Sequence, residues 1–213
     1  KIKMKELLGN HGIPVPLFKQ VNVDTLKNNP SDSFYDLLQY FKGDFFVKPV
    51  YGASAIGAFH IKNYEDFIYW ISQASENEYD CEEYINGTLY LCDSFIDNNK
   101  QIYSFPCEYL FPCHEYDKGK PLGIIPLKEN SDLRHRIINF SERVHKALSP
   151  YSGMTHLEVF VKNNGDIIFL EIGARPGGAG VPKILEINYE FNSYEQTLRY
   201  VLGLPIRDCC EMR

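Results

Sequence analysis

The segment that most constrains the fold is residues 155–178, in which two apolar, β-branched runs flank Asn164-Gly165. Asn-Gly between such runs is the strongest short-range signal for a β-hairpin with a two-residue turn. If these two residues form the centre of the turn, Glu158 and Glu171 lie equally far from it on the two strands. The hairpin therefore predicts that these two glutamates face each other directly.

Because side chains alternate between the faces of a strand, one face of this hairpin carries most of its polar residues. On that face we expect His156, Glu158, Phe160, Phe169, Glu171, Gly173 and Arg175. Directly opposed carboxylates, about 4.5–5.5 Å apart at Cβ, repel each other unless a positive charge lies between them. Hard carboxylate oxygens with no neighbouring Cys favour Mg²⁺ or Mn²⁺ as that charge. The alternative is a surface hairpin whose acids point into water.

A second polar segment follows the apolar strand expected at residues 45–50. Lys48 lies near the end of this strand, and the loop at residues 52–57 consists of Gly, Ala, Ser and Ile. Small residues let backbone N–H groups approach a phosphate closely, and a lysine adds a point charge for the same oxygens. The Lys precedes the glycines, so the segment is not a P-loop. Taken singly, it is also compatible with an ordinary hairpin loop beside a solvated lysine.

Composition limits the class of protein and its partners. The 213 residues are 44% hydrophobic and 23% charged, as in folded proteins with a sizeable core. A net charge of −6 argues against a general nucleic-acid-binding surface. No apolar run is long enough for a membrane span or a signal peptide, so we expect a cytoplasmic protein without membrane contact. Six cysteines without CxxC spacing disfavour a zinc site.

The remaining periodicities predict a mixed α+β chain with mostly antiparallel strands. Helices are expected around residues 4–11, 34–41, 64–71, 133–148, 184–188 and 194–202. Besides the hairpin, strands are expected at residues 45–50, 58–61, 79–85, 89–96 and 102–111, and a loop at residues 28–33. The chain opens on a Lys inside a helical pattern, without an initiating Met, so we expect it to be part of a longer protein.

Several of these segments, in this order, resemble the ATP-grasp superfamily of ATP-dependent carboxylate ligases. The resemblance is carried by KIKMKELLGNHGIPVP, VKPVYGASAIG, CEEYING, and HLEVF followed by FLEIGARPGG. It extends over residues 1–204 and implies an α+β ATP-grasp fold, in which two lobes with mostly antiparallel sheets clamp a nucleotide. We expect the lobes at residues 1–86 and 87–213, and an N-terminal domain that is absent from this chain.

The resemblance also implies which residues bind the nucleotide. Two lysines would hold the ATP phosphates under a mobile glycine-rich loop, and the end of the strand at residues 79–85 would contact adenine. Leu89 stands where the family often has a ribose-binding acid, so Asp93 is the substitute for that role. The full set of ATP-binding candidates is Lys1, Lys48, Gly52, Ser54, Gly57, Glu82, Glu83, Tyr84, Ile85 and Asp93.

For the metal and the chemistry, the resemblance points to the hairpin. Glu158 and Glu171 would be the Mg²⁺ ligands, which agrees with the register argument made without the family. Arg175 and Lys48 would act on the transferred phosphoryl group as catalytic residues. His156 would contact phosphate or the substrate carboxylate, with a hydrogen-bonded strand histidine as the alternative.

The resemblance implies a ligase in which a small-molecule carboxylate forms an acyl phosphate that an amine or thiol captures, releasing ADP and phosphate. A carrier protein as acceptor and a homodimer are further expectations. One alternative is an ATP-grasp kinase that phosphorylates a hydroxyl group. Another is a nucleotide-binding regulatory module without turnover, favoured by Leu89 and by Gly173 where the family commonly has Asn.

Overall fold

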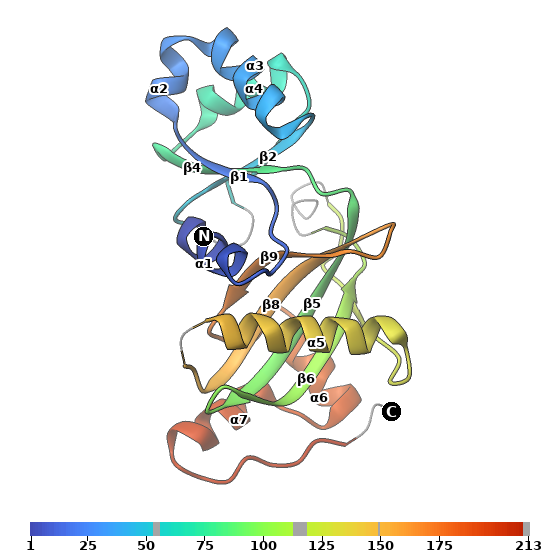
Figure 1. The fold of residues 1–213 in the computed structure, drawn as a ribbon. Coiled ribbons are helices and arrows are strands. Elements are labelled where there is room, and N and C mark those ends of the chain that lie inside the picture. Colours follow the sequence, from blue (N-terminus) through green and yellow to red (C-terminus); the bar gives the residue numbers. More distant parts are fainter. Residues whose placement is uncertain (53–55, 113–118, 149, 211–213) are drawn as a thin grey trace. The chain divides into compact units, whose positions relative to one another are not determined.

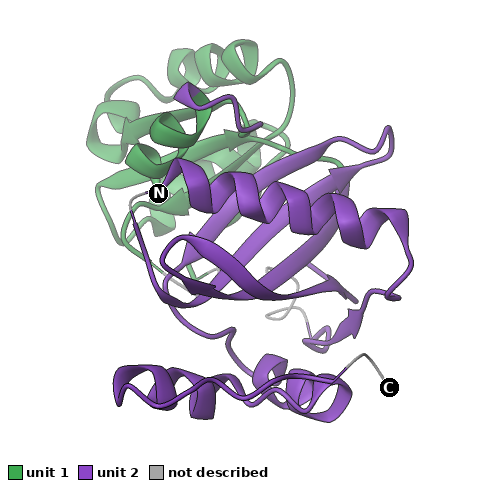
Figure 2. Ribbon diagram, turned by 60° about the horizontal axis from the view of Figure 1, so that its bottom comes forward, with its two compact units in different colours: residues 1–9, 15–86 green, residues 10–14, 87–213 purple. Residues whose placement is uncertain are grey.

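The computed structural model describes residues 1–52, 56–112, 119–148 and 150–210, in which helices and antiparallel strands are mixed (Figure 1). The chain divides into two compact units (Figure 2). Unit 1 comprises residues 1–9 and 15–86, and unit 2 comprises residues 10–14 and 87–213. Each unit contains one antiparallel sheet with helices, so the predicted α+β class is confirmed.

Unit 1 is built on a four-stranded sheet in the order β1-β4-β2-β3. Its strands are β1 (Phe18–Asn22), β2 (Phe45–Pro49), β3 (Phe59–Ile61) and β4 (Glu78–Glu83). Its helices are α1 (Ile2–Asn10), α2 (Val23–Asn28), α3 (Pro30–Phe41) and α4 (Tyr64–Gln73). The apolar stripes of α3 and α4 supply Phe34, Phe67 and Trp70 to a core that also contains Phe45 of β2. This core fixes the ends of β2 and β4, where several candidate residues lie.

The loop predicted at residues 28–33 is wrong, because only Asn29 separates α2 from α3. Asn22 caps α2 by accepting hydrogen bonds from the backbone N–H groups of Asp24 and Thr25. Pro30 stands in the first turn of α3, where a missing N–H costs nothing. Helix α2 has 6 residues, too few to show a helical period in the sequence.

Unit 2 is built on a five-stranded sheet in the order β7-β6-β5-β8-β9. Its strands are β5 (Gly87–Asp97), β6 (Lys100–Tyr109), β7 (Ile124–Pro126), β8 (Gly153–Lys162) and β9 (Ile167–Gly173). Its helices are α5 (Asp132–Ala147), α6 (Val181–Tyr189) and α7 (Ser193–Val201). The predicted hairpin is β8 with β9, and β8 also pairs with β5.

Alternate residues of β5 face different helices, so both faces of the sheet are covered. Leu91 and Phe95 belong to a core with Leu185 of α6. On the opposite face, where α5 runs across the strands (Figure 1), Ser94 Oγ lies 3.4 Å from Ser141 Oγ. Polar side chains on β5 and β8 that face α6 are therefore largely buried between the sheet and that helix.

Residues 10–14 belong to unit 2, whereas the sequence placed them in the first lobe. Two hydrogen bonds hold them there. The Phe169 N–H donates to the Pro14 carbonyl at 2.9 Å, and Arg143 Nη2 donates to the Gly12 carbonyl at 2.9 Å. None of the helices within the described ranges has both the length and the apolar character needed to cross a lipid bilayer.

Candidate functional site

The hairpin of β8 and β9 places Glu158 directly opposite Glu171, as predicted. The turn that joins the strands is not the predicted two-residue turn. The Lys162 N–H donates to the Asp166 carbonyl at 2.9 Å, which leaves residues 163–165 as the loop. Gly165 adopts φ 90°, and a glycine in the left-handed region is typical of three-residue hairpin loops.

A β-bulge at Leu170 compensates for the longer turn. Val159 pairs with Phe169 and Glu158 pairs with Glu171, so Leu170 has no partner on β8. The extra residue shifts the register by one position and restores the opposition of the two acids. Because Phe169 faces Val159, it lies on the other face of the sheet, and its predicted place beside Glu158 is wrong.

Glu158 is largely buried, with only 8% of the residue exposed, and Tyr109 and His156 contact its carboxylate. Tyr109 donates its hydroxyl to Glu158 Oε1 at 2.6 Å, and His156 Nε2 lies 3.5 Å from the same oxygen. Glu171, opposite, is half-buried. In the described ranges no group of three or more His, Cys, Asp or Glu side chains could hold a metal ion by itself. Two opposed carboxylates fit an Mg²⁺ whose other ligands come from water and substrate phosphates.

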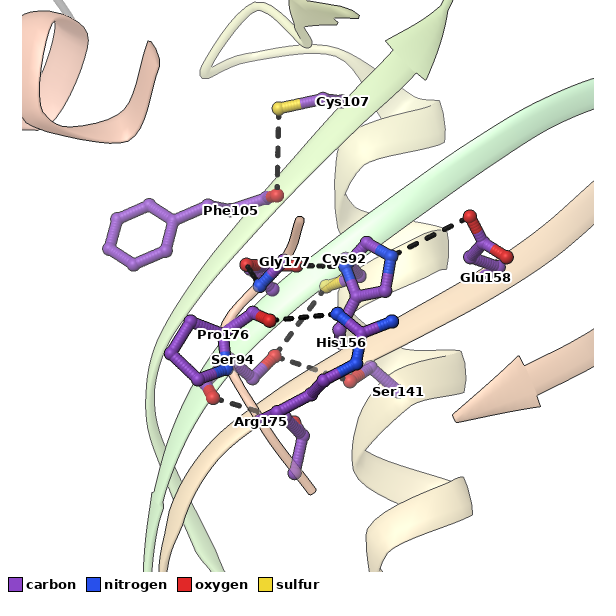
Figure 3. Close-up of polar contacts among 12 residues, drawn as sticks. Cys92, Ser94, Phe105, Cys107, Ser141, His156, Glu158, Arg175, Pro176 and Gly177 are labelled. Atoms are coloured by element: carbon purple, nitrogen blue, oxygen red, sulfur yellow. Dashed lines mark hydrogen bonds and ion pairs between the residues drawn. The ribbon is translucent and has the colours of Figure 1, made fainter. Parts of the chain in front are cut away.

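His156 lies between two carboxylates. Figure 3 shows its contact with one of them, Glu158. Its Nδ1 atom lies 2.5 Å from Asp93 Oδ1 on the neighbouring strand β5. Burial by itself lowers the pKa of His156, but hydrogen bonds and charge interactions with Asp93 and Glu158 outweigh it and raise the pKa to about 9. The hydrogen-bonded strand histidine, the alternative drawn from the sequence, is what the structure contains. Contact of His156 with phosphate or substrate stays a prediction.

Asp93 lies inside unit 2, and protein groups bind its carboxylate. The residue is fully buried, and its second oxygen, Oδ2, accepts a hydrogen bond from the Gly177 N–H at 2.8 Å. With Oδ1 bonded to His156, both carboxylate oxygens are engaged by protein groups. The pairing of β5 with β8 turns this side chain toward His156, so a ribose contact would compete with these bonds and stays a prediction.

Arg175 follows β9 on a short loop that leads to α6. The side chain is exposed, and its Nη1 atom donates to the Pro176 carbonyl at 2.9 Å (Figure 3). The next residue but one, Gly177, is buried and bonded to Asp93. The loop thus exposes the Arg175 guanidinium to solvent, while Gly177, two residues later, is hydrogen-bonded to a strand of the sheet.

In unit 1, Lys48 belongs to a buried cluster of four charged groups. Lys48 Nζ lies 2.9 Å from Glu82 Oε1, and Lys5 forms ion pairs with both Glu82 and Asp80, the latter at 2.6 Å. Burial by itself raises the pKa of Glu82, but the charges of Lys48 and Lys5 and hydrogen bonds from them lower it below its usual value. The predicted contact of the Glu82 side chain with adenine therefore competes with two ion pairs. Lys5 and Asp80 were missed.

The sequence spacing of Lys5 and Asp80 could have identified them as part of this cluster. Lys5 follows Lys1 by one helical turn, and Asp80 and Glu82 alternate on β4 and so share a face. Their charges balance, two positive and two negative, which is the condition for burying such a group.

The other predicted adenine contacts are partly engaged within unit 1. The Glu83 N–H donates to the Leu17 carbonyl at 2.8 Å, and the Tyr84 N–H donates to the Asp44 carbonyl at 3.1 Å. Tyr84 is exposed and Ile85 is buried. Adenine binding by this strand end stays a prediction.

The side chain of Lys1 reaches the backbone just before the glycine-rich loop and at the first residue of that loop. Its Nζ atom donates to the carbonyls of Pro49 at 3.1 Å and Gly52 at 2.8 Å. Gly57 closes the loop with φ 72°, and a Cβ there would lie 3.1 Å from Pro49 Cγ, so only glycine fits without strain. Ser54, also predicted to bind ATP, lies outside the described residues.

A family model described as D-ala D-ala ligase C-terminus matches residues 7–186. Among curated proteins, an L-arginine-specific L-amino acid ligase of Bacillus subtilis is 24% identical over 206 residues, which cover 93% of this chain and 48% of that protein. A D-alanine–D-alanine ligase of Halothermothrix orenii is 26% identical over 186 residues, covering 82% and 52%. The chain spans about half the length of these curated relatives.

Solved structures match the whole fold. A carboxyaminoimidazole ribonucleotide synthase from Aspergillus clavatus, complexed with ATP, superposes with a TM-score of 0.79 at 17% identity and covers 100% of this chain and 54% of that one. An L-amino acid ligase from Bacillus licheniformis gives a TM-score of 0.74 at 19% identity, covering 98% and 50%. At these identities the likeness shows a shared fold, which is the architecture that the sequence predicted.

Proposed function

Because the chain belongs to the D-ala D-ala ligase C-terminus family of ATP-grasp proteins, we propose that it is the ATP-binding part of a carboxylate-amine ligase. The observation that carries the proposal is the pair of opposed glutamates, Glu158 and Glu171, with Arg175 on the loop that follows them. Facing carboxylates on paired strands cost repulsion energy. A metal ion bound together with a nucleotide would offset this repulsion and give the two glutamates a function.

In the proposed reaction, a carboxylate oxygen of one substrate attacks the γ-phosphorus of ATP. The bond between that phosphorus and the β,γ-bridging oxygen breaks, and ADP leaves. An amine nitrogen then attacks the acyl carbon of the resulting acyl phosphate, phosphate departs, and the nitrogen loses a proton. No side-chain nucleophile is required, so the task of the protein is to orient the reactants and stabilise charge.

Glu158 and Glu171 would hold an Mg²⁺ ion through their carboxylate oxygens. Bound there, the metal would neutralise phosphate charge during transfer. The ion pair of Glu158 with His156 and its hydrogen bond from Tyr109 restrict how the side chain can turn, which suits a fixed ligand. Mn²⁺ offers the same hard character and would replace Mg²⁺ in binding measurements.

Three cations are proposed to act on the phosphates. Lys1 and Lys48 would bind ATP oxygens together with backbone N–H groups of the loop at residues 52–57. Lys48 is 9% exposed and already ion-paired with Glu82, so its position is fixed before the nucleotide arrives. Arg175 is exposed on its loop, and its planar guanidinium suits the transferred phosphoryl group.

The names of the curated relatives support amino acids as the carboxylate and amine substrates. A thiol acceptor, a carrier protein, a homodimer and a cytoplasmic location belong to the same proposal, and each needs its own measurement. A role as kinase receives no support from these relatives, which are ligases by name.

The proposal is tested by product analysis of the full-length protein with ATP, Mg²⁺ and pairs of amino acids. We expect equal amounts of ADP and phosphate for the pair that is ligated, and a hydroxamate when hydroxylamine replaces the amine. ATP binding without cleavage for any substrate would indicate a regulatory module. Phosphate attached stably to a hydroxyl group would indicate a kinase.

A further inference from the structure

We propose that Asp93 is a positioning residue that ties the metal-binding hairpin to the loop carrying Arg175, through His156 on one side and Gly177 on the other. The inference rests on the proposed function. It replaces the ribose contact expected from the sequence with a different task for the same side chain.

The first arm runs from Asp93 through His156 to Glu158. Asp93 Oδ1 and His156 Nδ1 are 2.5 Å apart across the paired strands β5 and β8. The other ring nitrogen lies 3.5 Å from Glu158 Oε1. The hydrogen bond at Nδ1 restricts rotation of the imidazole and keeps its Nε2 side turned toward the metal-ligand candidate. This is the arrangement by which outer partners orient metal ligands.

The second arm runs from Asp93 to the backbone of the Arg175 loop. The Gly177 N–H donates to Asp93 Oδ2 at 2.8 Å. A Cβ on Gly177 would lie 2.8 Å from that oxygen and 2.6 Å from Val181 Cγ1, so the close approach requires glycine. The anchored N–H lies two residues after Arg175 and four before Val181, the first residue of α6. The loop is thereby fixed just beyond its catalytic candidate.

A fully buried carboxylate is kept only when donors satisfy it, and Asp93 has donors from two different elements. It stands on β5, which is hydrogen-bonded to strands on both sides and faces a packed core at Leu91 and Phe95. A site on such a rigid strand can hold two functional groups at a constant separation. Asp93 thus contacts both His156 and the loop.

Three substitutions in the full-length protein separate the two arms. Asp93→Asn keeps size but replaces one of the two acceptor oxygens by an NH2 group, so the side chain can no longer accept hydrogen bonds from both a protonated His156 and the Gly177 N–H. His156→Gln breaks the arm to Glu158, and Gly177→Ala breaks the arm to the loop. Asp97→Asn makes the same chemical change on the same strand, where Asp97 bonds Asn98, and serves as control.

Two readouts do not depend on turnover. Mn²⁺ affinity in the presence of a non-hydrolysable ATP analogue reports the hairpin. The hydrogen-exchange rate of the Gly177 amide in the metal-free protein reports the loop anchor. We expect His156→Gln to weaken Mn²⁺ binding by about 10–100-fold, the usual cost of losing an outer partner of a metal ligand.

Gly177→Ala should lower kcat with Mn²⁺ affinity unchanged. Asp93→Asn should lower kcat and should either speed exchange at Gly177 or weaken Mn²⁺ binding, according to the arm that is lost. Asp97→Asn should leave Mn²⁺ affinity, Gly177 exchange and kcat as they are. If the Asp93→Asn and Gly177→Ala proteins only melt earlier, while Mn²⁺ affinity, Gly177 exchange and kcat stay within twofold of the unaltered protein, Asp93 is structural and the inference is overturned. Should Asp93→Asn fail to fold, the other two variants decide, because His156→Gln acts at the hairpin end and Gly177→Ala at the loop end. Failure of the proposed function shows separately, as an absence of ADP release by the unaltered protein.

Discussion

Glu158 and Glu171 face each other on β8 and β9 because a bulge at Leu170 cancels the shift caused by a three-residue turn. Without the bulge, a side chain from the other face of β9 would stand opposite Glu158. The turn and the bulge together thus set the register that places the two glutamates opposite each other.

Removing either acid should abolish tight binding of a metal-nucleotide complex. We expect Glu158→Gln and Glu171→Gln each to weaken Mg-ATP binding by on the order of 10²-fold, at least the cost of losing an outer partner. Calorimetry with and without Mg²⁺ measures the effect. Glu142→Gln on α5, where the side chain is 46% exposed, is the matched control. Unchanged affinity in both site variants would remove the metal from this hairpin.

In the absence of metal, Glu171→Gln should have the opposite effect on stability. The substitution removes one of two facing negative charges, and relief of that repulsion is worth roughly 0.2–1 kcal/mol. Urea unfolding in EDTA should therefore show a raised midpoint for the variant. Adding Mg-ATP should stabilise the unaltered protein and reverse the order. A variant less stable than the unaltered protein in EDTA would mean that Glu171 has a stabilising partner.

Arg175→Ala should separate catalysis from binding. The side chain is exposed and bonds only the next residue's carbonyl among the described contacts, so its removal should leave folding intact. We expect kcat to fall by about 10²–10³-fold with ATP affinity little changed, since the charge acts mainly in the transition state. Arg207→Ala, on the C-terminal segment, is the control for a lost surface arginine. Equal losses in affinity and kcat would assign Arg175 to ground-state binding instead.

Lys5→Met tests the buried charge cluster of unit 1. The substitution removes the ion pairs of Lys5 with Asp80 and Glu82 and leaves Lys48 as the remaining lysine of the cluster. Breaking a buried ion pair typically costs about 3–5 kcal/mol. Urea unfolding of the variant should show that loss, and ATP binding should fall if Lys48 is drawn toward Asp80. Lys3→Met, exposed on the same helix, should change neither quantity. A stable Lys5→Met protein would show that the cluster is not needed for the fold.

The sequence predicted the elements and the facing acids because these depend on local patterns. Alternation along a strand and an Asn-Gly turn are visible within about twenty residues, and so is the apolar stripe of α3. The exact turn was missed because Asn163-Asn164-Gly165 can form either a two-residue or a three-residue loop. The bulge at Leu170 leaves no mark in composition, since only pairing with β8 defines it.

Long-range partners were beyond the reach of the sequence. Asp93 and His156 are 63 residues apart, and only the pairing of β5 with β8 shows that the aspartate is buried against the histidine. Lys5 and Asp80 are 75 residues apart, and their pairing depends on how α1 packs in unit 1. In both cases the residue types were conspicuous, and their partners were decided by tertiary structure.

In the proposed reaction, ATP activates a carboxylate by phosphorylating it. The most direct measurement uses a carboxylate substrate labelled with ¹⁸O, incubated with the full-length protein, ATP, Mg²⁺ and the amine. We expect one labelled oxygen to pass into inorganic phosphate, seen by its isotope shift in ³¹P NMR, while the nucleotide product is ADP. Label recovered in AMP, with release of pyrophosphate, would mean adenylation and would contradict an acyl phosphate intermediate.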